Sequence, residues 1–187
     1  MSSFNFNKEE QQILIEVSRA TLKELLFGST EKLNVEITES ISRKCGVFVS
    51  LYSQNQLRGC IGNFISDLPL HKNIEKMTIA ASTNDYRFNR LEPDEFNNVS
   101  IELSILSPLE QIFSLDELEL GKHGIYIKKD FRSGTFLPQV AHKTNWTKEE
   151  FVAHCSNDKA GLGWTGWKEA ELFRYEAFII NENALHK

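Results

Sequence analysis

The chain lacks the sequence features that define several common enzyme classes. Its 187 residues include only three cysteines, Cys45, Cys60 and Cys155, which are too far apart for the Cys-x-x-x-Cys-x-x-Cys run of radical-SAM enzymes. A P-loop, which cradles nucleotide phosphates, and a Gly-x-Ser-x-Gly nucleophile elbow are also missing. An odd number of widely spaced cysteines is typical of a protein from a reducing compartment.

Long apolar runs and basic clusters are absent as well. No apolar run reaches the roughly 18 residues that a membrane-spanning helix needs. Lys8, Glu9 and Glu10 precede the first apolar stretch, which is not the pattern of a secretion signal. The net charge is −5, so the usual electrostatic contribution to nucleic-acid binding is missing. We therefore expect a cytoplasmic protein without membrane contact, and we consider a nucleic-acid partner unlikely on this charge.

The apolar residues that are present suffice for a packed core and follow clear periods. Three segments have the helical period: 8–27, 67–84 and 148–155. Asn7 and Glu10 form a capping box before the first of them, and Gly28 ends it. Alternation predicts strands over 44–52, 57–61, 99–106, around 125–127 and over 173–179, with turns at 53–56 and 130–134. The pattern predicts an α+β fold with a mostly antiparallel sheet and packed helices.

Leu57-Arg58-Gly59-Cys60-Ile61-Gly62 is the most informative stretch, and we call it the hexapeptide. It places a cation, a thiol and two glycines within six positions. Glycine allows positive φ and close approach of a ligand, and successive N–H groups in such a turn can bind an anion. A thiol beside a guanidinium can have a lowered pKa. Composition alone does not distinguish an active site from a tight turn.

The hexapeptide resembles the signature of the AMMECR domain family, whose bacterial branch is called AmmeMemoRadiSam system protein A. Further blocks that resemble the family follow in the same order up to about position 163: residues 85–88, 100–106, 121–125, 137–141 and 159–162. Two residues depart from the family pattern. Tyr86 stands where the family has proline in Asp-Pro-Arg-Phe, and Asn89 where a second proline is common. Both changes loosen this loop, because proline restricts the unfolded chain.

The resemblance implies one AMMECR-type domain over residues 1–187, built of two intimately packed lobes that share one cleft. It also implies partner proteins of the Memo-like and radical-SAM types. It carries no settled activity, so the chemistry must be argued from the residues.

Cys60 is the first candidate catalytic residue, as a thiolate activated by Arg58 and by backbone dipoles. His123 is the second, as a general base toward Cys60. The alternatives are a small buried side chain for Cys60 and a histidine that only hydrogen-bonds the backbone. We expect Cys45 and Cys155 to be core residues.

The candidate ligand-binding residues are Arg58, Gly59, Gly62, Asp85, Arg87 and Lys159. Arg58 and Arg87 could form a two-guanidinium clamp for a carboxylate or phosphate. The alternative is that Arg87 pairs with Asp85 or Asp94 to hold a loop. Lys159 could contact an anionic ligand, or it could simply complement a helix C-terminus.

These residues support a first hypothesis of a cleft that binds a small anionic or nucleotide-like metabolite and acts on it through the Cys60 thiolate. The second is a non-enzymatic regulatory or adaptor subunit, and the third and weakest is RNA binding. The sequence leaves enzymatic activity undecided. It predicts no cofactor and no dedicated metal site, because no two histidines have ligand spacing with a cysteine or carboxylate.

Overall fold

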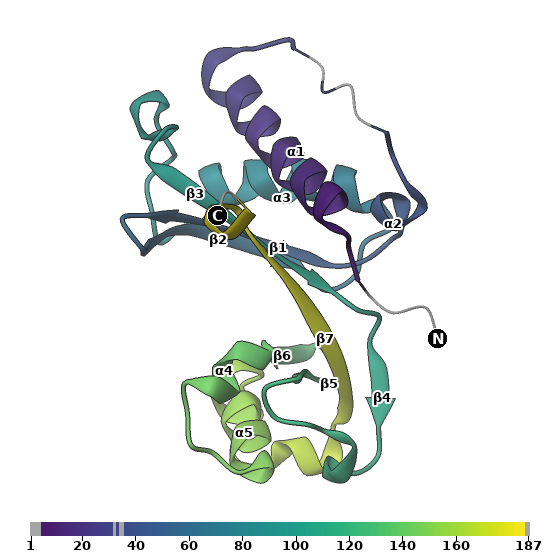
Figure 1. The fold of residues 1–187 in the computed structure, drawn as a ribbon. Coiled ribbons are helices and arrows are strands. Elements are labelled where there is room, and N and C mark those ends of the chain that lie inside the picture. The colour runs from purple at the N-terminus through teal and green to yellow at the C-terminus, as the bar shows by residue number, and fades with distance from the viewer. Residues whose placement is uncertain (1–4, 32, 34–35, 186–187) are drawn as a thin grey trace. The chain divides into compact units, whose positions relative to one another are not determined.

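The computed structural model describes residues 5–31, 33 and 36–185, and the chain divides into two compact units. The first comprises Met1–Leu106 and Phe178–Lys187, and the second comprises Ser107–Ala177. Figure 1 shows the course of the chain through both units. Among the described residues, no helix is long and apolar enough to cross a membrane. The expected cleft shared by two lobes stays a prediction.

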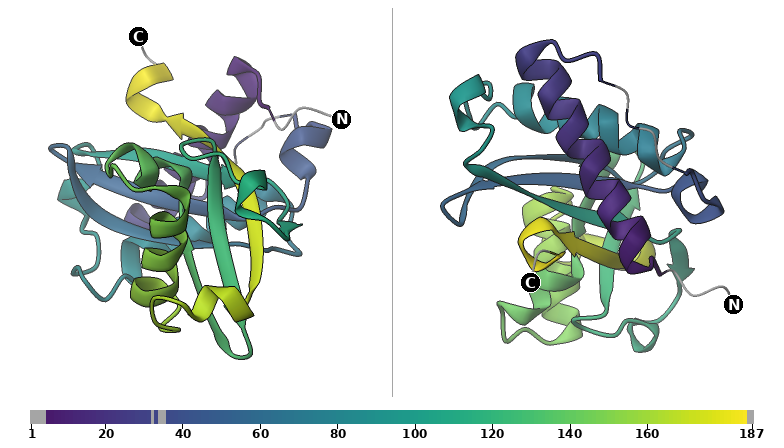
Figure 2. Two further views of the ribbon diagram at one scale, coloured as in Figure 1. Left: turned by 90° about the horizontal axis from the view of Figure 1, so that it is seen from below. Right: turned by 45° about the horizontal axis from the view of Figure 1, so that its top comes forward.

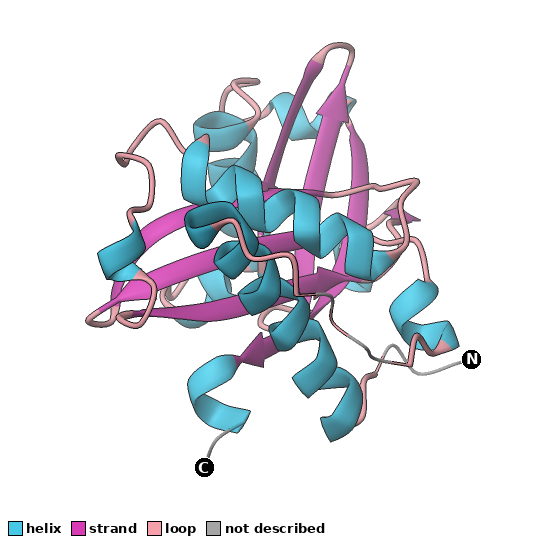
Figure 3. Ribbon diagram, turned by 90° about the horizontal axis from the view of Figure 1, so that it is seen from above, coloured by secondary structure: helices cyan, strands magenta, loops and turns pink. Residues whose placement is uncertain are grey.

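The first unit is an antiparallel sheet with its helices on one face. Its strands lie in the order β2-β1-β3 and are β1 (Val47–Ser53), β2 (Gln56–Asn63) and β3 (Val99–Leu106). The helices are α1 (Lys8–Phe27), α2 (Glu39–Ser42), α3 (Leu70–Thr83) and the terminal α6 (Glu182–Leu185). Figure 3 shows the long helices crossing over these strands. The arrangement confirms the predicted α+β class.

Local sequence signals set the bounds of α1, which runs across the sheet in the right view of Figure 2. Asn7 and Glu10 form the predicted capping box, with each side chain bonded to the other residue's backbone. Gly28 takes φ 66° and donates its N–H to the carbonyl of Glu24. The buried face of α1 includes Leu14 and Leu22, which join the apolar side of β1 and β3 in the first core.

The second unit is built on the hairpin of β5 (His123–Lys129) and β6 (Arg132–Phe136), to which β7 (Glu171–Asn181) adds from the other side. The short β4 (Glu110–Ile112) pairs with the other edge of β7. Two helices, α4 (Pro138–His142) and α5 (Lys148–His154), follow the hairpin and appear in green in the left view of Figure 2. The residues of β7 from Phe178 onward belong to the first unit.

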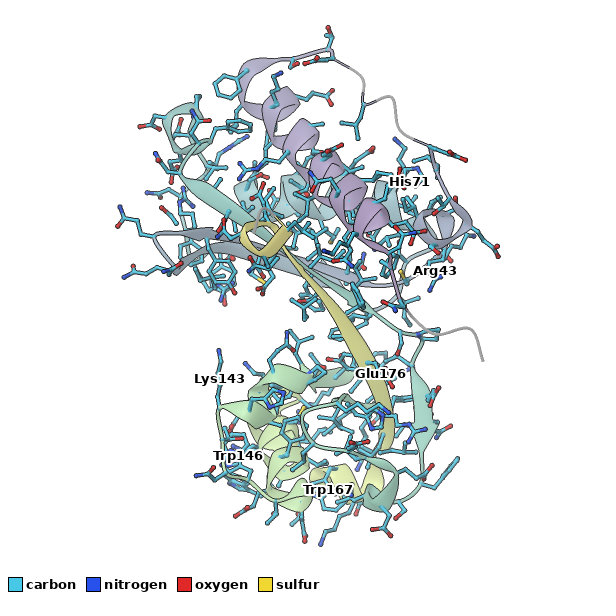
Figure 4. The ribbon with its side chains drawn as sticks, in the orientation of Figure 1. Arg43, His71, Lys143, Trp146, Trp167 and Glu176 are labelled. Carbon is cyan, nitrogen blue, oxygen red and sulfur yellow. The ribbon has the colours of Figure 1, made fainter. Side chains whose placement is uncertain are left out.

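A separate core holds the second unit together. Phe151, Val152 and Cys155 of α5 and the turn after it pack against Ile125 and Ile127 of β5. Trp146 and Trp167, labelled in Figure 4, pack around this core. Sequence reasoning missed three elements here, β4, β6 and α4. The predicted turn at 130–134 is wrong in its second half, because β6 begins at Arg132 and only two residues close the hairpin.

We predict that Gly59→Ala destabilises the protein by about 1–3 kcal/mol, because a methyl group there would overlap the carbonyl oxygen of Ala81 in α3. Urea unfolding measures the effect. Gln56→Ala, at an exposed position of the same strand, is the control and should change the free energy of unfolding by less than about 0.5 kcal/mol. Equal stability of Gly59→Ala and the wild type would show that α3 and β2 are not packed this closely.

Candidate functional site

The hexapeptide lies within β2, at the edge of the first unit's sheet. Side chains alternate along a strand, so its residues divide between the two faces. Gly59 lies against the backbone of α3, and Ile61 packs on the first core. Cys60 lies on the opposite face, paired with Ser50 of β1. The thiol is therefore outside the apolar core.

The two glycines serve close packing of the chain. Among the described residues, the glycines with positive φ lie elsewhere, so Gly59 and Gly62 do not form the anion-binding turn that the sequence suggested. A Cβ atom at Gly59 would overlap the backbone of Ala81, and one at Gly62 would overlap the ring of Phe48. A ligand-binding role for these glycines stays a prediction.

Cys60 is the most accessible of the three cysteines. It is half-buried, whereas Cys45 and Cys155 are buried in the two cores. Burial raises the pKa of Cys45 to about 11 and that of Cys155 to about 12. The hydroxyl of Ser50 donates a hydrogen bond of 3.2 Å to the sulfur of Cys60. Of the three cysteines, Cys60 is therefore the one that a solute can approach most easily.

The outward backbone groups of Cys60 are bound by side chains of the loop after α3. The N–H of Cys60 donates to Oδ2 of Asp85 at 2.8 Å, and Nη2 of Arg87 donates to the carbonyl of Cys60 at 3.4 Å. An edge strand leaves such groups unpaired unless something covers them. Asp85 and Arg87 thus take the place of a neighbouring strand at this position.

Asp85 and Arg87 form a close ion pair. Nε and Nη2 of Arg87 donate to Oδ1 and Oδ2 of Asp85 at 2.9 and 2.7 Å, and the N–H of Arg87 also donates to Oδ1. The Asp85 side chain is 3% exposed and that of Arg87 is 46% exposed. Hydrogen bonds from Arg87 hold the pKa of Asp85 well below its usual range, and the bonds to Asp85 raise the pKa of Arg87. The sequence allowed Arg87 to pair with either Asp85 or Asp94, and in the structure it pairs with Asp85.

Arg58 is also engaged by a carboxylate. Its Nε and Nη2 donate to Glu95 at 2.6 and 2.9 Å, which lowers the pKa of that carboxyl. The guanidinium also donates to the carbonyls of Asn89 and Arg90. Arg58 therefore ties β2 to the segment that follows α3, and its donors are largely used.

A hollow of about 410 Å³ lies over this loop and is lined by Arg58, Tyr86, Arg87, Phe88 and Asn89. Nη1 of Arg87 has no hydrogen-bond partner in the part of the chain that the structure describes. Tyr86 is 95% exposed. The structure therefore brings together Arg58, Gly59, Cys60, Asp85 and Arg87, although Cys60 does not line the hollow itself.

His123 and Lys159 belong to the second unit. His123 begins β5 and is buried, and its Nδ1 accepts a hydrogen bond of 3.0 Å from the N–H of Glu119. Burial lowers the pKa of His123. Lys159 is exposed at the end of the turn after α5, with its ammonium over the ring of Phe136. The role of His123 as a general base toward Cys60 and the role of Lys159 as a ligand contact stay predictions.

Sequence reasoning missed three features of this region. Glu95 and Ser50, the partners of Arg58 and Cys60, carry no motif and could be found only from the strand register and the loop path. The third feature lies in the second unit, where Gly161–Gly166 has the spacing Gly-x-Gly-x-x-Gly. From the sequence alone, this spacing would have suggested a dinucleotide site. It follows a helical turn and enters a 3-10 helix of four residues, so it lacks the strand-to-helix setting of that motif. Among the described residues there is no group of three side chains placed to hold a metal ion.

Comparison with known proteins agrees with this fold. The profile of the family described as AMMECR1 matches residues 15–180. A protein of Methanosarcina barkeri, Mbar_A1807, is 34% identical over 183 residues, covering 92% of this chain and 90% of that protein. A protein of Nanoarchaeum equitans, NEQ441, is 32% identical over 180 residues, covering 91% and 99%. The crystal structure of protein PH0010 from Pyrococcus horikoshii is similar with a TM-score of 0.81 and 30% identity, covering 93% of this chain and 92% of that one.

We predict that Asp85→Asn lowers the free energy of unfolding by about 2 kcal/mol at pH 7, because the buried carboxylate loses its charge while Arg87 keeps its own. The pKa of Asp85 is depressed in the folded state, so its contribution is complete above the unfolded pKa of about 4 and is lost as the pH falls below that value. Urea unfolding at pH 7 and pH 3 should therefore show a smaller difference at pH 3.

The matched control is Asp94→Asn, at an exposed position on the same loop. It should alter stability by less than about 0.5 kcal/mol at either pH. A loss at Asp94 as large as the loss at Asp85, or a difference at Asp85 that does not depend on pH, would contradict the assigned pairing.

Proposed function

The chain belongs to the AMMECR1 family, and from the site around the hexapeptide we propose that it binds a small anionic ligand in the hollow beside Arg87, with Cys60 adjacent to the bound group. The observation that carries the proposal is a guanidinium held rigidly on one side and open on the other. Asp85 binds Nε and Nη2, while Nη1 has no hydrogen-bond partner among the described residues, and Arg87 lines the hollow. A preorganised guanidinium loses little freedom when it binds a carboxylate or phosphate.

The ion pair with Asp85 supports this role for Arg87. Asp85 also accepts the N–H groups of Cys60 and Arg87, so the carboxylate is fixed from several directions. The Asp85 side chain is buried, whereas the Arg87 side chain is nearly half exposed, so solvent and ligands meet the residue that carries the positive charge first. The remaining donor of Arg87 can form a charge-assisted hydrogen bond to an anion.

Arg58 has a different role from the one suggested by the sequence, in which it formed an anion clamp together with Arg87. Glu95 and two carbonyls use its donors, so it holds the wall of the hollow and leaves anion binding to Arg87. The expected pair of guanidiniums acting together on one ligand is therefore replaced by one binding cation and one structural cation.

Cys60 is in contact with Arg87, because Nη2 of Arg87 donates a hydrogen bond to the carbonyl of Cys60. A ligand bound to Arg87 would therefore lie near a cysteine that is only half-buried. Reaction of the bound ligand with the Cys60 thiol is a further part of the proposal.

Other assignments remain predictions that no contact described above supports. These are the place of the chain in the bacterial branch of the family, partners of the Memo-like and radical-SAM types, and the roles of His123 and Lys159. An adaptor without catalysis stays the alternative function. It would use the same surface without binding a small anion.

We predict that inorganic phosphate added to the protein shifts the backbone amide resonances of residues 85–89, measured by two-dimensional NMR. Arg87→Gln should weaken the binding on the order of tenfold, because it removes a charge-assisted hydrogen bond. Arg90→Gln is the control, since it removes an exposed positive charge from the same loop without altering the lining of the hollow.

The wild-type shifts alone test the site, whatever the stability of Arg87→Gln. Shifts scattered over the surface, or equal losses in Arg87→Gln and Arg90→Gln, would mean that phosphate senses only the general charge of the loop. No shift at residues 85–89 at any phosphate concentration would remove the proposal.

The position of Cys60 is tested by two alkylating reagents that differ in charge. The measured quantity is the ratio of the rate with iodoacetate to the rate with neutral iodoacetamide. We predict that this ratio is roughly fivefold higher for Cys60 than for free glutathione, because Arg87 attracts the carboxylate of iodoacetate by ~1 kcal/mol. Phosphate should abolish this preference. Mass spectrometry of the folded protein should find Cys45 and Cys155 unmodified. A preference equal to that of glutathione would separate the thiol from the anion site.

A further inference from the structure

We infer that the anion bound beside Arg87 carries a flat aromatic ring, as a nucleoside monophosphate does, and that Tyr86 stacks on that ring. The inference rests on the proposed function, because it assigns the ligand class of the same hollow. It is carried by the side chains that surround Arg87.

Tyr86 is the first of these side chains. Its residue is 95% exposed, although it lies between Asp85, which is buried, and Arg87, which is fixed by an ion pair. The loop is held at this point by the bond from the N–H of Phe88 to the carbonyl of Asp85. The backbone of Tyr86 is therefore anchored, while its large ring contributes no burial to the fold. An exposed aromatic ring on an anchored backbone, at the rim of a hollow, is suited to stacking on a ligand.

Phe88 and Arg87 add a second layer. The guanidinium carbon of Arg87 lies 5.4 Å from the centre of the Phe88 ring, so the cation is held between an aromatic face and the Asp85 carboxylate. A cation and aromatic rings in one lining recognise the two parts of a nucleotide, its phosphate and its base. A simple carboxylic acid or phosphate would use only the cation.

Asn89 completes the lining. Its carbonyl is fixed by Arg58, and its exposed side-chain amide has no hydrogen-bond partner within the described ranges. An asparagine side chain offers a donor NH2 group and an acceptor oxygen, which together match the edge of an adenine. The hollow has a volume of about 410 Å³ and is open to solvent, so a bound nucleotide would keep part of its surface in water.

A free nucleotide fits the charge of the chain better than a nucleic acid does. The net charge is −5, and a polymer would bring many phosphates against a chain with no basic run in its sequence. A single phosphate needs only the one open guanidinium that the hollow provides.

The test compares three probes by NMR titration of the full chain. They are 5′-AMP, ribose 5-phosphate, which lacks the base, and adenosine, which lacks the phosphate. We expect 5′-AMP to bind roughly 5- to 140-fold more tightly than ribose 5-phosphate, the range that stacking of one base supports. Adenosine should bind more weakly than 5′-AMP, because it does not engage Arg87.

Two variants isolate the ring of Tyr86. Tyr86→Leu keeps apolar bulk but removes the ring, and it should bring the affinity for 5′-AMP down to that for ribose 5-phosphate. Tyr86→Phe keeps the ring and should retain the difference. Because residue 86 is exposed, both variants should fold as the wild type does, and neither should change the affinity for ribose 5-phosphate.

The outcomes separate this inference from the proposed function. If ribose 5-phosphate binds through Arg87 as tightly as 5′-AMP, or if Tyr86→Leu retains the preference, the stacking inference is overturned while anion binding stands. If neither phosphate compound binds, both fail. A 5′-phosphorylated oligoadenylate that binds more tightly than 5′-AMP would overturn the assignment to a free nucleotide.

Discussion

The carboxylate of Asp85 is the group on which the arrangement of the site depends. It is buried, it is negatively charged, and it accepts hydrogen bonds from the backbone of β2 and from the guanidinium of Arg87. Removing such a charge from water is costly unless its partners are well placed. The carboxylate therefore fixes the distance between an edge strand and the loop after α3. That distance determines where Arg87 stands and whether a hollow exists beside it.

The same interaction can be read as purely structural, and the geometry shows why the two readings are compatible. A structural ion pair can leave one partner open to a ligand. Here the anion is enclosed and the cation is not, with 3% and 46% of the side chains exposed. Arg58 gives the contrast within one site, because its side chain is 17% exposed and its donors already meet Glu95 and two carbonyls. The difference between the two arginines lies in what remains exposed after each has paired.

Much of the fold could be predicted from local signals, and much less of the site. The bounds of α1 and β3 follow from a capping box, a terminal glycine and strict alternation, all of which act within a few residues. Strand β6 was missed because its exposed, half-polar sequence has no apolar alternation. The pairing of Arg87 with Asp85 was one of two alternatives that sequence proximity allowed. The pairing of Arg58 with Glu95 spans 37 positions and depends on the loop path, which no local pattern encodes.

The division of the chain into two units also limits the roles that the candidate residues can have. Every side chain that lines the hollow, and every contact that fixes Arg87, comes from the first unit. Binding of an anion there needs no residue of the second unit.

His123, by contrast, already uses Nδ1 to accept the N–H of Glu119, which leaves the proton of the neutral ring on Nε2. As a general base it would first have to give up that hydrogen bond, and burial, which lowers its pKa, further weakens it as a proton acceptor. Any catalysis at Cys60 would therefore depend on groups of the first unit, of which Ser50 already bonds the sulfur and Arg87 lines the proposed anion site.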